Sequence, residues 1–123
     1  MTLNARVLVV EDDPANQATM SALLTGMGHR PTVAERGDEA LQLLHSTLAL
    51  DLIISDVVMP GMSGLDFARR ARHARPGMPI VLVTGDSEAM ETVLASGAIA
   101  LLKPYSPDTL RQVVGESLEE KHA

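Results

Sequence analysis

Short runs of aliphatic and β-branched residues alternate along the chain with longer segments in which apolar residues recur every three or four positions. Short runs of this kind are typical of strands, and the longer period is typical of amphipathic helices. We predict strands at residues 6–10, 30–34, 51–55, 79–83 and 98–102. We predict helices at residues 14–27, 37–48, 64–75, 87–96 and 107–120. This alternation indicates an α/β fold in which a parallel sheet is covered on both faces.

Polar residues follow four of the predicted strands at the point where each strand ends. Glu11, Asp12 and Asp13 follow the first strand, Asp56 the third, Thr84 the fourth and Lys103 the fifth. All strands of a parallel sheet point the same way, so these residues gather at one edge, where open α/β folds bind their ligands. The sequence therefore predicts one crevice that holds acids, a hydroxyl and an ammonium group.

The charges in this crevice suggest its chemistry. Neighbouring carboxylates repel one another, and a hard divalent cation such as Mg²⁺ relieves the repulsion through oxygen ligands. Lys103 and Thr84 are then donors for an anion beside the metal, and a phosphoryl group suits them because its oxygens accept such contacts. Asp56 is the candidate nucleophile that would carry the phosphoryl group.

Composition narrows the class of protein. With 123 residues, of which 46% are hydrophobic, the chain has the size and apolar content of one domain with an ordinary core. Sixteen acidic against ten basic residues give a net charge of −6, which argues against nucleic-acid binding by net charge. The chain has no cysteine and no apolar stretch long enough for a signal peptide or a membrane span, and we expect a cytoplasmic location.

Four motifs in order, "VVEDD", "SDVVMPGMSG", "VTG" and "LLKPY", resemble the receiver domain of two-component response regulators across nearly the whole chain. The resemblance implies a flavodoxin-like (CheY-like), doubly wound, five-stranded parallel sheet in the order 2-1-3-4-5, flanked by five helices. It also implies a phosphorylation-dependent switch of a phosphorelay, not an enzyme. We expect residues 1–123 to form a single receiver domain, with no output domain in this chain.

The resemblance implies roles for the acids of the crevice. Asp56 corresponds to the phosphoacceptor, and Mg²⁺ would be held by Glu11, Asp12, Asp56 and the backbone carbonyl of Val58. The pair formed by Glu11 and Asp12 departs from the commoner pair of two aspartates, and the longer side chain should still reach a metal. We interpret the third acid, Asp13, as a solvated or helix-capping residue.

The "VTG" and "LLKPY" motifs would form the switch. Thr84 and Lys103 correspond to the hydroxyl and ammonium that sense the phosphoryl group, and Tyr105 corresponds to the aromatic switch residue. Thr84 would move toward the phosphoryl group, Tyr105 would rotate into the vacated space, and the surface of the fourth helix, fifth strand and fifth helix would change. A homodimer through that surface is possible, and we expect the bond between Lys103 and Pro104 to be cis.

The expected partner is a histidine kinase or a histidine phosphotransfer protein. The first helix should bury Met20, Leu23, Leu24 and Met27, which leaves Ala15, Ala18 and Ala22 on an outward face beside the crevice. These small side chains form our candidate partner-binding surface. The motifs are similar to those of receivers in hybrid sensor kinases, so the chain is either a freestanding receiver or part of a larger protein.

Two other classes of function stay open on the sequence alone. A phosphatase similar to the haloacid dehalogenases would use the same Asp, Thr and Lys, but needs a second acid two residues after the nucleophile, where this chain has Val58. A degenerate receiver that only binds a partner would not need the complete set of Asp56, Thr84 and Lys103. Both alternatives are therefore less favoured than a phosphoacceptor.

Overall fold

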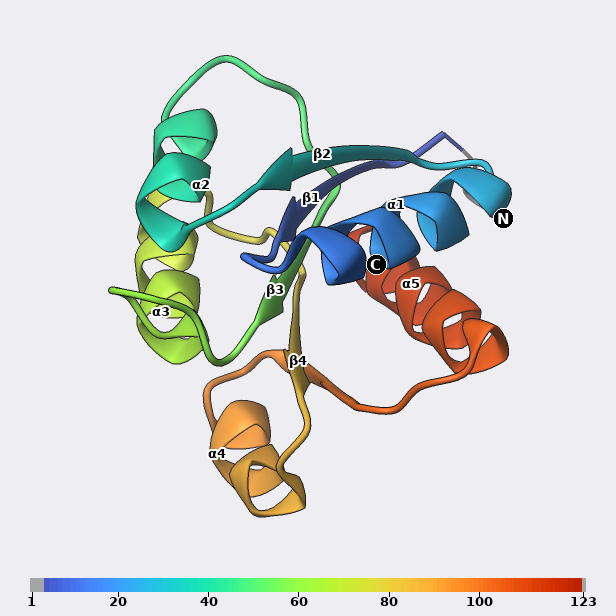
Figure 1. The fold of residues 1–123 in the computed structure, drawn as a ribbon. Helices are drawn as coiled ribbons and strands as arrows, with labels where there is room; N and C mark the ends of the chain where they lie inside the picture. Colours follow the sequence, from blue (N-terminus) through green and yellow to red (C-terminus); the bar gives the residue numbers. More distant parts are fainter. Residues whose placement is uncertain (1–3, 123) are drawn as a thin grey trace.

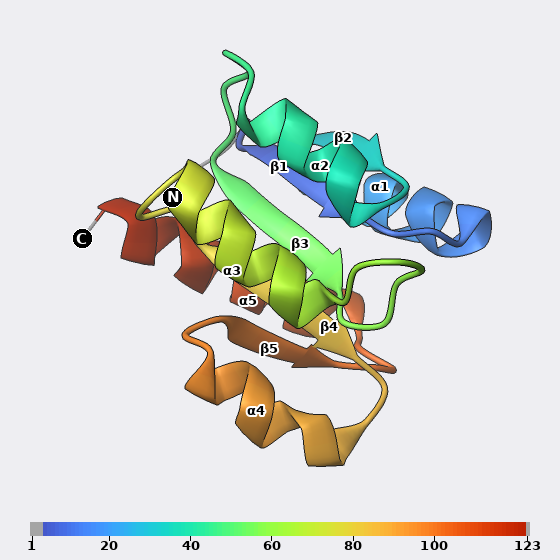
Figure 2. The same ribbon diagram turned by 90° about the vertical axis from the view of Figure 1, so that its left-hand side faces the viewer.

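A computed structural model describes residues 4–122, with the side chains of 4–119, as five parallel strands in the order β2-β1-β3-β4-β5 and helices on both faces (Figures 1 and 2). Order and alternation are those predicted from the sequence. The strands are β1 (Arg6–Val10), β2 (Arg30–Ala34), β3 (Leu52–Asp56), β4 (Ile80–Thr84) and β5 (Ile99–Leu102). The helices are α1 (Pro14–Gly26), α2 (Gly37–Leu44), α3 (Gly64–Ala74), the 3₁₀ turn η1 (Ser87–Ala89), α4 (Met90–Ala95) and α5 (Pro107–His122).

Alternate strand residues divide the core into two layers. On one face of the sheet, Leu8, Ile53 and Leu82 pack in a cluster that includes residues of α2, α3 and α4. On the other face, the second cluster combines neighbouring strand residues such as Ile54 and Val83 with residues of α1 and α5. Successive side chains of a strand point to opposite faces, so both layers follow from the same apolar runs. The faces are visible in Figure 2, where α2 and α3 lie in front of the sheet.

Three of the predicted helices agree with the observed ones to within two residues at each end, and the other two differ more. The helix expected at 37–48 ends at Leu44, where the guanidinium of Arg75 donates hydrogen bonds to the carbonyls of Leu43, Leu44 and Ser46. These bonds satisfy carbonyls that a helix end leaves without partners. The helix expected at 87–96 is divided into η1 and α4. Among the described residues, no helix is long and apolar enough to cross a lipid bilayer.

Local side chains set the start of the helices beside the sheet edge. The carboxylate of Asp13 accepts a hydrogen bond of 2.9 Å from the backbone N–H of Asn16, and Pro14 occupies the first turn of α1. This is an N-cap, as expected for the third acid of the motif.

On α3, Asp66 pairs with Arg69 and Arg70, which agrees with a solvated face for this arginine-rich helix.

His29 lies at the opposite end of the sheet from the predicted crevice and is expected to make stability depend on pH. It is buried, and its Nδ1 accepts a hydrogen bond of 3.2 Å from the backbone N–H of Ala5. Burial lowers the pKa of His29, and Asp51 opposes this effect only in part. Because the unfolded chain takes up the proton first, the free energy of unfolding should fall as pH drops below about 6.5.

Urea unfolding at pH 7.5 and 5.5 checks this expectation with a matched variant. The decrease in the free energy of unfolding on acidification is at most about 1.4 kcal/mol for each unit by which the pKa of His29 is lowered. His29→Gln keeps a hydrogen-bond acceptor but does not titrate, so it should lose less stability than the wild type over this range. An equal loss in both proteins would contradict the role of His29.

Candidate functional site

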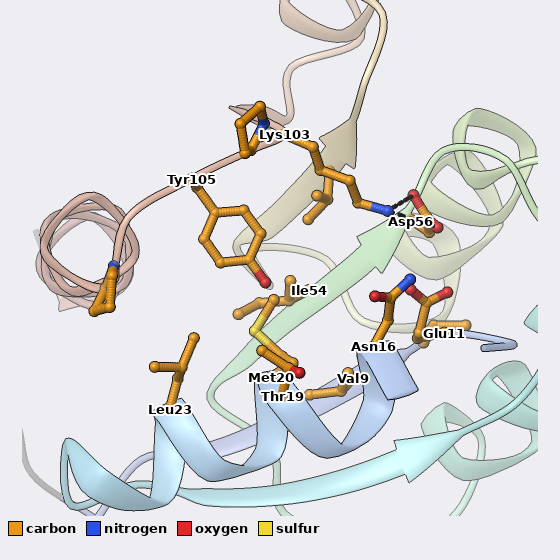
Figure 3. Close-up of a pocket in the computed structure, with 14 residues that line it drawn as sticks. Val9, Glu11, Asn16, Thr19, Met20, Leu23, Ile54, Asp56, Lys103 and Tyr105 are labelled. Atoms are coloured by element: carbon orange, nitrogen blue, oxygen red, sulfur yellow. Dashed lines mark hydrogen bonds and ion pairs between the residues drawn. The ribbon is translucent and has the colours of Figure 1, made fainter. Parts of the chain in front are cut away.

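Glu11, Asp56 and Lys103, which the sequence predicts to share a crevice, lie together at the carboxyl edge of the sheet (Figure 3). Glu11 directly follows β1, Asp56 and Thr84 are the last residues of β3 and β4, and Lys103 directly follows β5. The register pairs Asp56 with Val83 and Thr84 with Leu102, so the ends of these strands stand side by side. The sheet thus positions four side chains that are far apart in the sequence.

Three acids form one cluster at this edge. Glu11, Asp12 and Asp56 each offer a carboxylate oxygen, and these oxygens lie within 4.8 Å of one another. Glu11 is buried and accepts a hydrogen bond of 2.9 Å from the backbone N–H of Asp12. Burial raises the pKa of Glu11, the charge of Asp56 adds to this effect, and Lys103 opposes it. A set of close carboxylate oxygens with one half-open side fits the hard-cation chemistry of Mg²⁺.

The ammonium of Lys103 lies on the other side of Asp56. Its Nζ is 3.3 and 3.4 Å from the two carboxylate oxygens, a contact drawn as a dashed line in Figure 3. The Asp56 side chain is 14% exposed, so it is reachable from solvent but largely held by its surroundings. Asp56 is therefore the one residue of the site that lies beside both the other two acids and the ammonium.

Thr84 is linked to Lys103 through the backbone. The carbonyl of Thr84 accepts a hydrogen bond of 2.8 Å from the backbone N–H of Lys103. The buried hydroxyl of Thr84 accepts a bond of 3.1 Å from the backbone N–H of Asp86, which leaves its own proton able to point elsewhere. The carboxylate of Asp86 accepts from the N–H of Glu88 at 2.9 Å, so it caps η1.

The loop after Asp56 contains a close backbone approach that the sequence reading did not identify. Gly64, the first residue of α3, donates a hydrogen bond of 2.7 Å to the carbonyl of Val57. A Cβ atom at Gly64 would lie 2.2 Å from the carbonyl oxygen of Asp56, well inside contact distance. The only signal in the sequence was a glycine directly after the capping Ser63, where other residues are also common. Gly64 therefore holds α3 against the backbone of Asp56.

A cavity of about 640 Å³ continues from the acids along α1. Glu11, Asp56 and Lys103 line its polar end, and most of the remaining wall is apolar. The side chains that line it from α1 are Asn16, Thr19, Met20 and Leu23. Pro104 and Tyr105 close it from the segment between β5 and α5, and Pro107 closes it from the start of α5. Figure 3 shows the Tyr105 ring reaching into the cavity toward Ile54 and Met20.

Comparisons with known proteins agree with this geometry. The family model of the response regulator receiver domain matches residues 7–115. This chain belongs to the response regulator receiver domain family. The receiver is 37% identical over 112 residues to the DNA-binding response regulator MtrA of Mycolicibacterium smegmatis, covering 89% of this chain and 48% of that protein. It is 33% identical over 119 residues to the transcriptional regulatory protein GlrR of Escherichia coli, covering 94% of this chain and 27% of that protein. The receiver thus spans less than half the length of these relatives.

Solved structures place the receiver in the same fold. It matches a CheY-like receiver domain protein of Methanospirillum hungatei with a TM-score of 0.87 and 29% identity, covering 98% of both chains. It matches the response regulator TrrA of Thermotoga maritima, solved in complex with Mg²⁺ and BeF, with a TM-score of 0.85 and 31% identity, covering 93% of this chain and 99% of that one. The predicted family, fold and strand order are therefore confirmed. The predicted cis bond between Lys103 and Pro104 is also present.

The receiver differs from expectation in the surroundings of Tyr105. Leu82 and Val83 point to opposite faces of the sheet, so the next residue, Thr84, points to the face covered by α3 and α4. Tyr105 packs against the other cluster, which is covered by α1 and α5. The expected rotation of Tyr105 into space vacated by Thr84 is contradicted by this geometry, because the sheet separates the two side chains.

The outward face of α1 in the receiver carries the three alanines of the candidate partner-binding surface. Met20 and Leu24 are buried, as predicted, whereas Leu23 and Met27, also predicted to be buried, are half-buried. Ala15, Ala18 and Ala22 are all exposed, but the α1 side chains that line the cavity beside the acids are Asn16, Thr19, Met20 and Leu23. The alanines lie next to this row on the helix and do not line the cavity themselves.

Proposed function

We propose that this receiver accepts a phosphoryl group on Asp56 from a phosphohistidine and acts as a switch in a two-component phosphorelay. Receiver domains are phosphorylation-dependent switches as a family, and this chain belongs to that family. The observation that supports Asp56 as the acceptor is its carboxylate, which has two acids on one side and the Lys103 ammonium on the other. The protein would act as a signalling domain whose only reactions are its own phosphorylation and slow dephosphorylation.

Each residue of the site has a part in the transfer. An oxygen of Asp56 forms the new bond to phosphorus as the bond between phosphorus and the histidine nitrogen breaks, and the bonding electrons leave with the imidazole. Lys103 and the hydroxyl of Thr84 bind the phosphoryl oxygens. Glu11, Asp12, Asp56 and the backbone carbonyl of Val58 would hold Mg²⁺, as receiver domains generally do. When bound, Mg²⁺ offsets the negative charge of the carboxylates and the phosphoryl group.

The transfer step is tested by labelling with acetyl phosphate, followed by intact mass. The wild type should gain one phosphoryl group in Mg²⁺ and lose most of this labelling when EDTA removes the metal, because the carboxylates then repel the donor. Equal labelling with and without the metal would contradict the proposed metal site.

A change at the surface of α4, β5 and α5 would carry the output. Thr84 ends β4 beside Leu102 of β5, so a movement of its hydroxyl toward the phosphoryl group acts on this side of the sheet. Leu94 and Leu102 are 59% and 39% exposed there, an apolar surface suited to a homodimer or another partner. Sizing the protein with and without Mg²⁺ and beryllofluoride tests the dimer, which should form only in their presence.

The phosphodonor would approach along α1. This helix carries no charged residue, and its exposed Ala15, Ala18 and Ala22 leave room for a helix of a histidine kinase or a histidine phosphotransfer protein. Ala18→Glu should slow transfer from a phosphohistidine donor and leave labelling by acetyl phosphate unchanged. Equal slowing with both donors would place the docking surface elsewhere.

We propose a cytoplasmic location, no insertion into membranes and no direct contact with nucleic acid.

The phosphorylated form is expected to be long-lived for a receiver. Hydrolysis needs a water aligned behind the phosphorus, and Val58, two residues after Asp56, is 78% exposed but offers no hydrogen bond to such a water. The Asp86 carboxylate is engaged in capping η1. Val58→Asn should therefore accelerate decay in Mg²⁺ by a factor of up to about 10². Decay of the wild type within seconds, or no change in Val58→Asn, would contradict this expectation.

A further inference from the structure

We infer that the ring of Tyr105 reports the state of the Asp56 site to α1 and to the start of α5, on the face of the sheet away from Thr84. This inference rests on the proposed phosphorylation of Asp56. A second surface, besides the one formed by α4, β5 and α5, would then change on phosphorylation. The change would pass from Asp56 to Tyr105 without involving Thr84.

The first support is a short connection between the two sites. Lys103 contacts the Asp56 carboxylate through its ammonium, at 3.3 and 3.4 Å, and Tyr105 follows two residues later. A phosphoryl group on Asp56 adds charge and acceptor oxygens at the point where the Lys103 ammonium lies. Lys103 must adjust to those oxygens, and the segment that carries Tyr105 adjusts with it.

The second support is that Tyr105 has room to move. Its ring is half-buried in a cavity of about 640 Å³, within the range of cavities that accept small molecules. No hydrogen bond of its hydroxyl to another described residue holds the ring in place, so packing alone determines its position. The other aromatic residue, Phe67, is fully buried in the opposite core layer and has no such freedom.

The third support is the identity of the neighbours. Within the cavity the ring of Tyr105 faces α1, whose Thr19, Met20 and Leu23 line the same space (Figure 3). Pro107, at the start of α5, also lines this cavity. A different rotamer of the ring would therefore change the packing of α1 and α5 before that of α4. Because α1 is also the uncharged helix beside the site, this relay would alter the surface that the phosphodonor uses.

The experiment uses Mg²⁺ and beryllofluoride as a stand-in for the phosphoryl group. Fluorine NMR first establishes that beryllofluoride is bound. Tyr105 is the only tyrosine in a chain without tryptophan, so tyrosine emission reports on this ring alone. Backbone amide signals of Leu23 and Val93 report on α1 and α4. We expect beryllofluoride to change the tyrosine emission and to shift the signals of both helices in the wild type.

Two variants separate the relay from a general change of structure. Tyr105→Phe keeps the ring and should retain the shift of Leu23, because the hydroxyl makes no bond that the relay needs. Tyr105→Leu keeps apolar volume without the ring and should lose the shift of Leu23 while that of Val93 persists. The Leu23 shift persisting in Tyr105→Leu, or unchanged emission in wild type with bound beryllofluoride, would overturn the relay. If fluorine NMR detects no bound beryllofluoride in the wild type, the proposed function itself fails, and the relay with it.

Discussion

Asp56→Asn is expected to abolish labelling by acetyl phosphate. The amide removes the anionic oxygen that attacks phosphorus, and no other residue of the cluster lies beside both the remaining acids and Lys103. Intact mass after incubation with acetyl phosphate and Mg²⁺ measures the result. The expected loss is complete within detection.

The control for this variant is Asp38→Asn, which removes an exposed carboxylate at the start of α2, outside the acid cluster. It should be labelled as the wild type is. Persistent labelling of Asp56→Asn at another residue would show that the acceptor was misassigned.

Gly64→Ala is expected to lower both stability and labelling. Its Cβ atom would lie 2.2 Å from the carbonyl oxygen of Asp56 and 2.7 Å from the Cα of Val57, and neither is the flexible end of a side chain. Relief requires α3 to move away from the loop that carries Asp56, at a cost of about 2–4 kcal/mol in the free energy of unfolding. Urea unfolding measures the stability, and acetyl phosphate measures the labelling.

Gly85→Ala is the matched control because it also lies beside the site, directly after Thr84, but its Cβ would meet no atom within 4 Å. Its free energy of unfolding should stay within about 0.5 kcal/mol of the wild type. Equal stability of Gly64→Ala and Gly85→Ala would contradict the close approach at Gly64.

The positions of the side chains at the strand ends could be predicted from the sequence, because all strands of a parallel sheet point the same way. Asp56 and Lys103 are 47 residues apart, yet both end up at the carboxyl edge of the sheet. Parallel strands joined by helices have no other arrangement for these residues, so the crevice followed from the alternation alone. The face of the sheet to which each strand side chain points could also be predicted, because successive side chains of a strand point to opposite faces.

The direction of Tyr105 could not be predicted in this way. It lies in the segment between β5 and α5, where no strand or helix period determines which side of the sheet a side chain takes. The end of α2 was missed for a different reason. Arg75 satisfies its last carbonyls from 29 to 32 residues away, a contact that local patterns do not contain.

The most direct test of the proposed function is to locate the phosphoryl group in the wild-type protein. After incubation with acetyl phosphate and Mg²⁺, borohydride reduces an aspartyl phosphate to homoserine, and peptide mass mapping identifies the residue. The proposed function requires homoserine at position 56 and unmodified residues at positions 11 and 12. A modification at Glu11, at Asp12 or on a histidine, with position 56 unchanged, would contradict it.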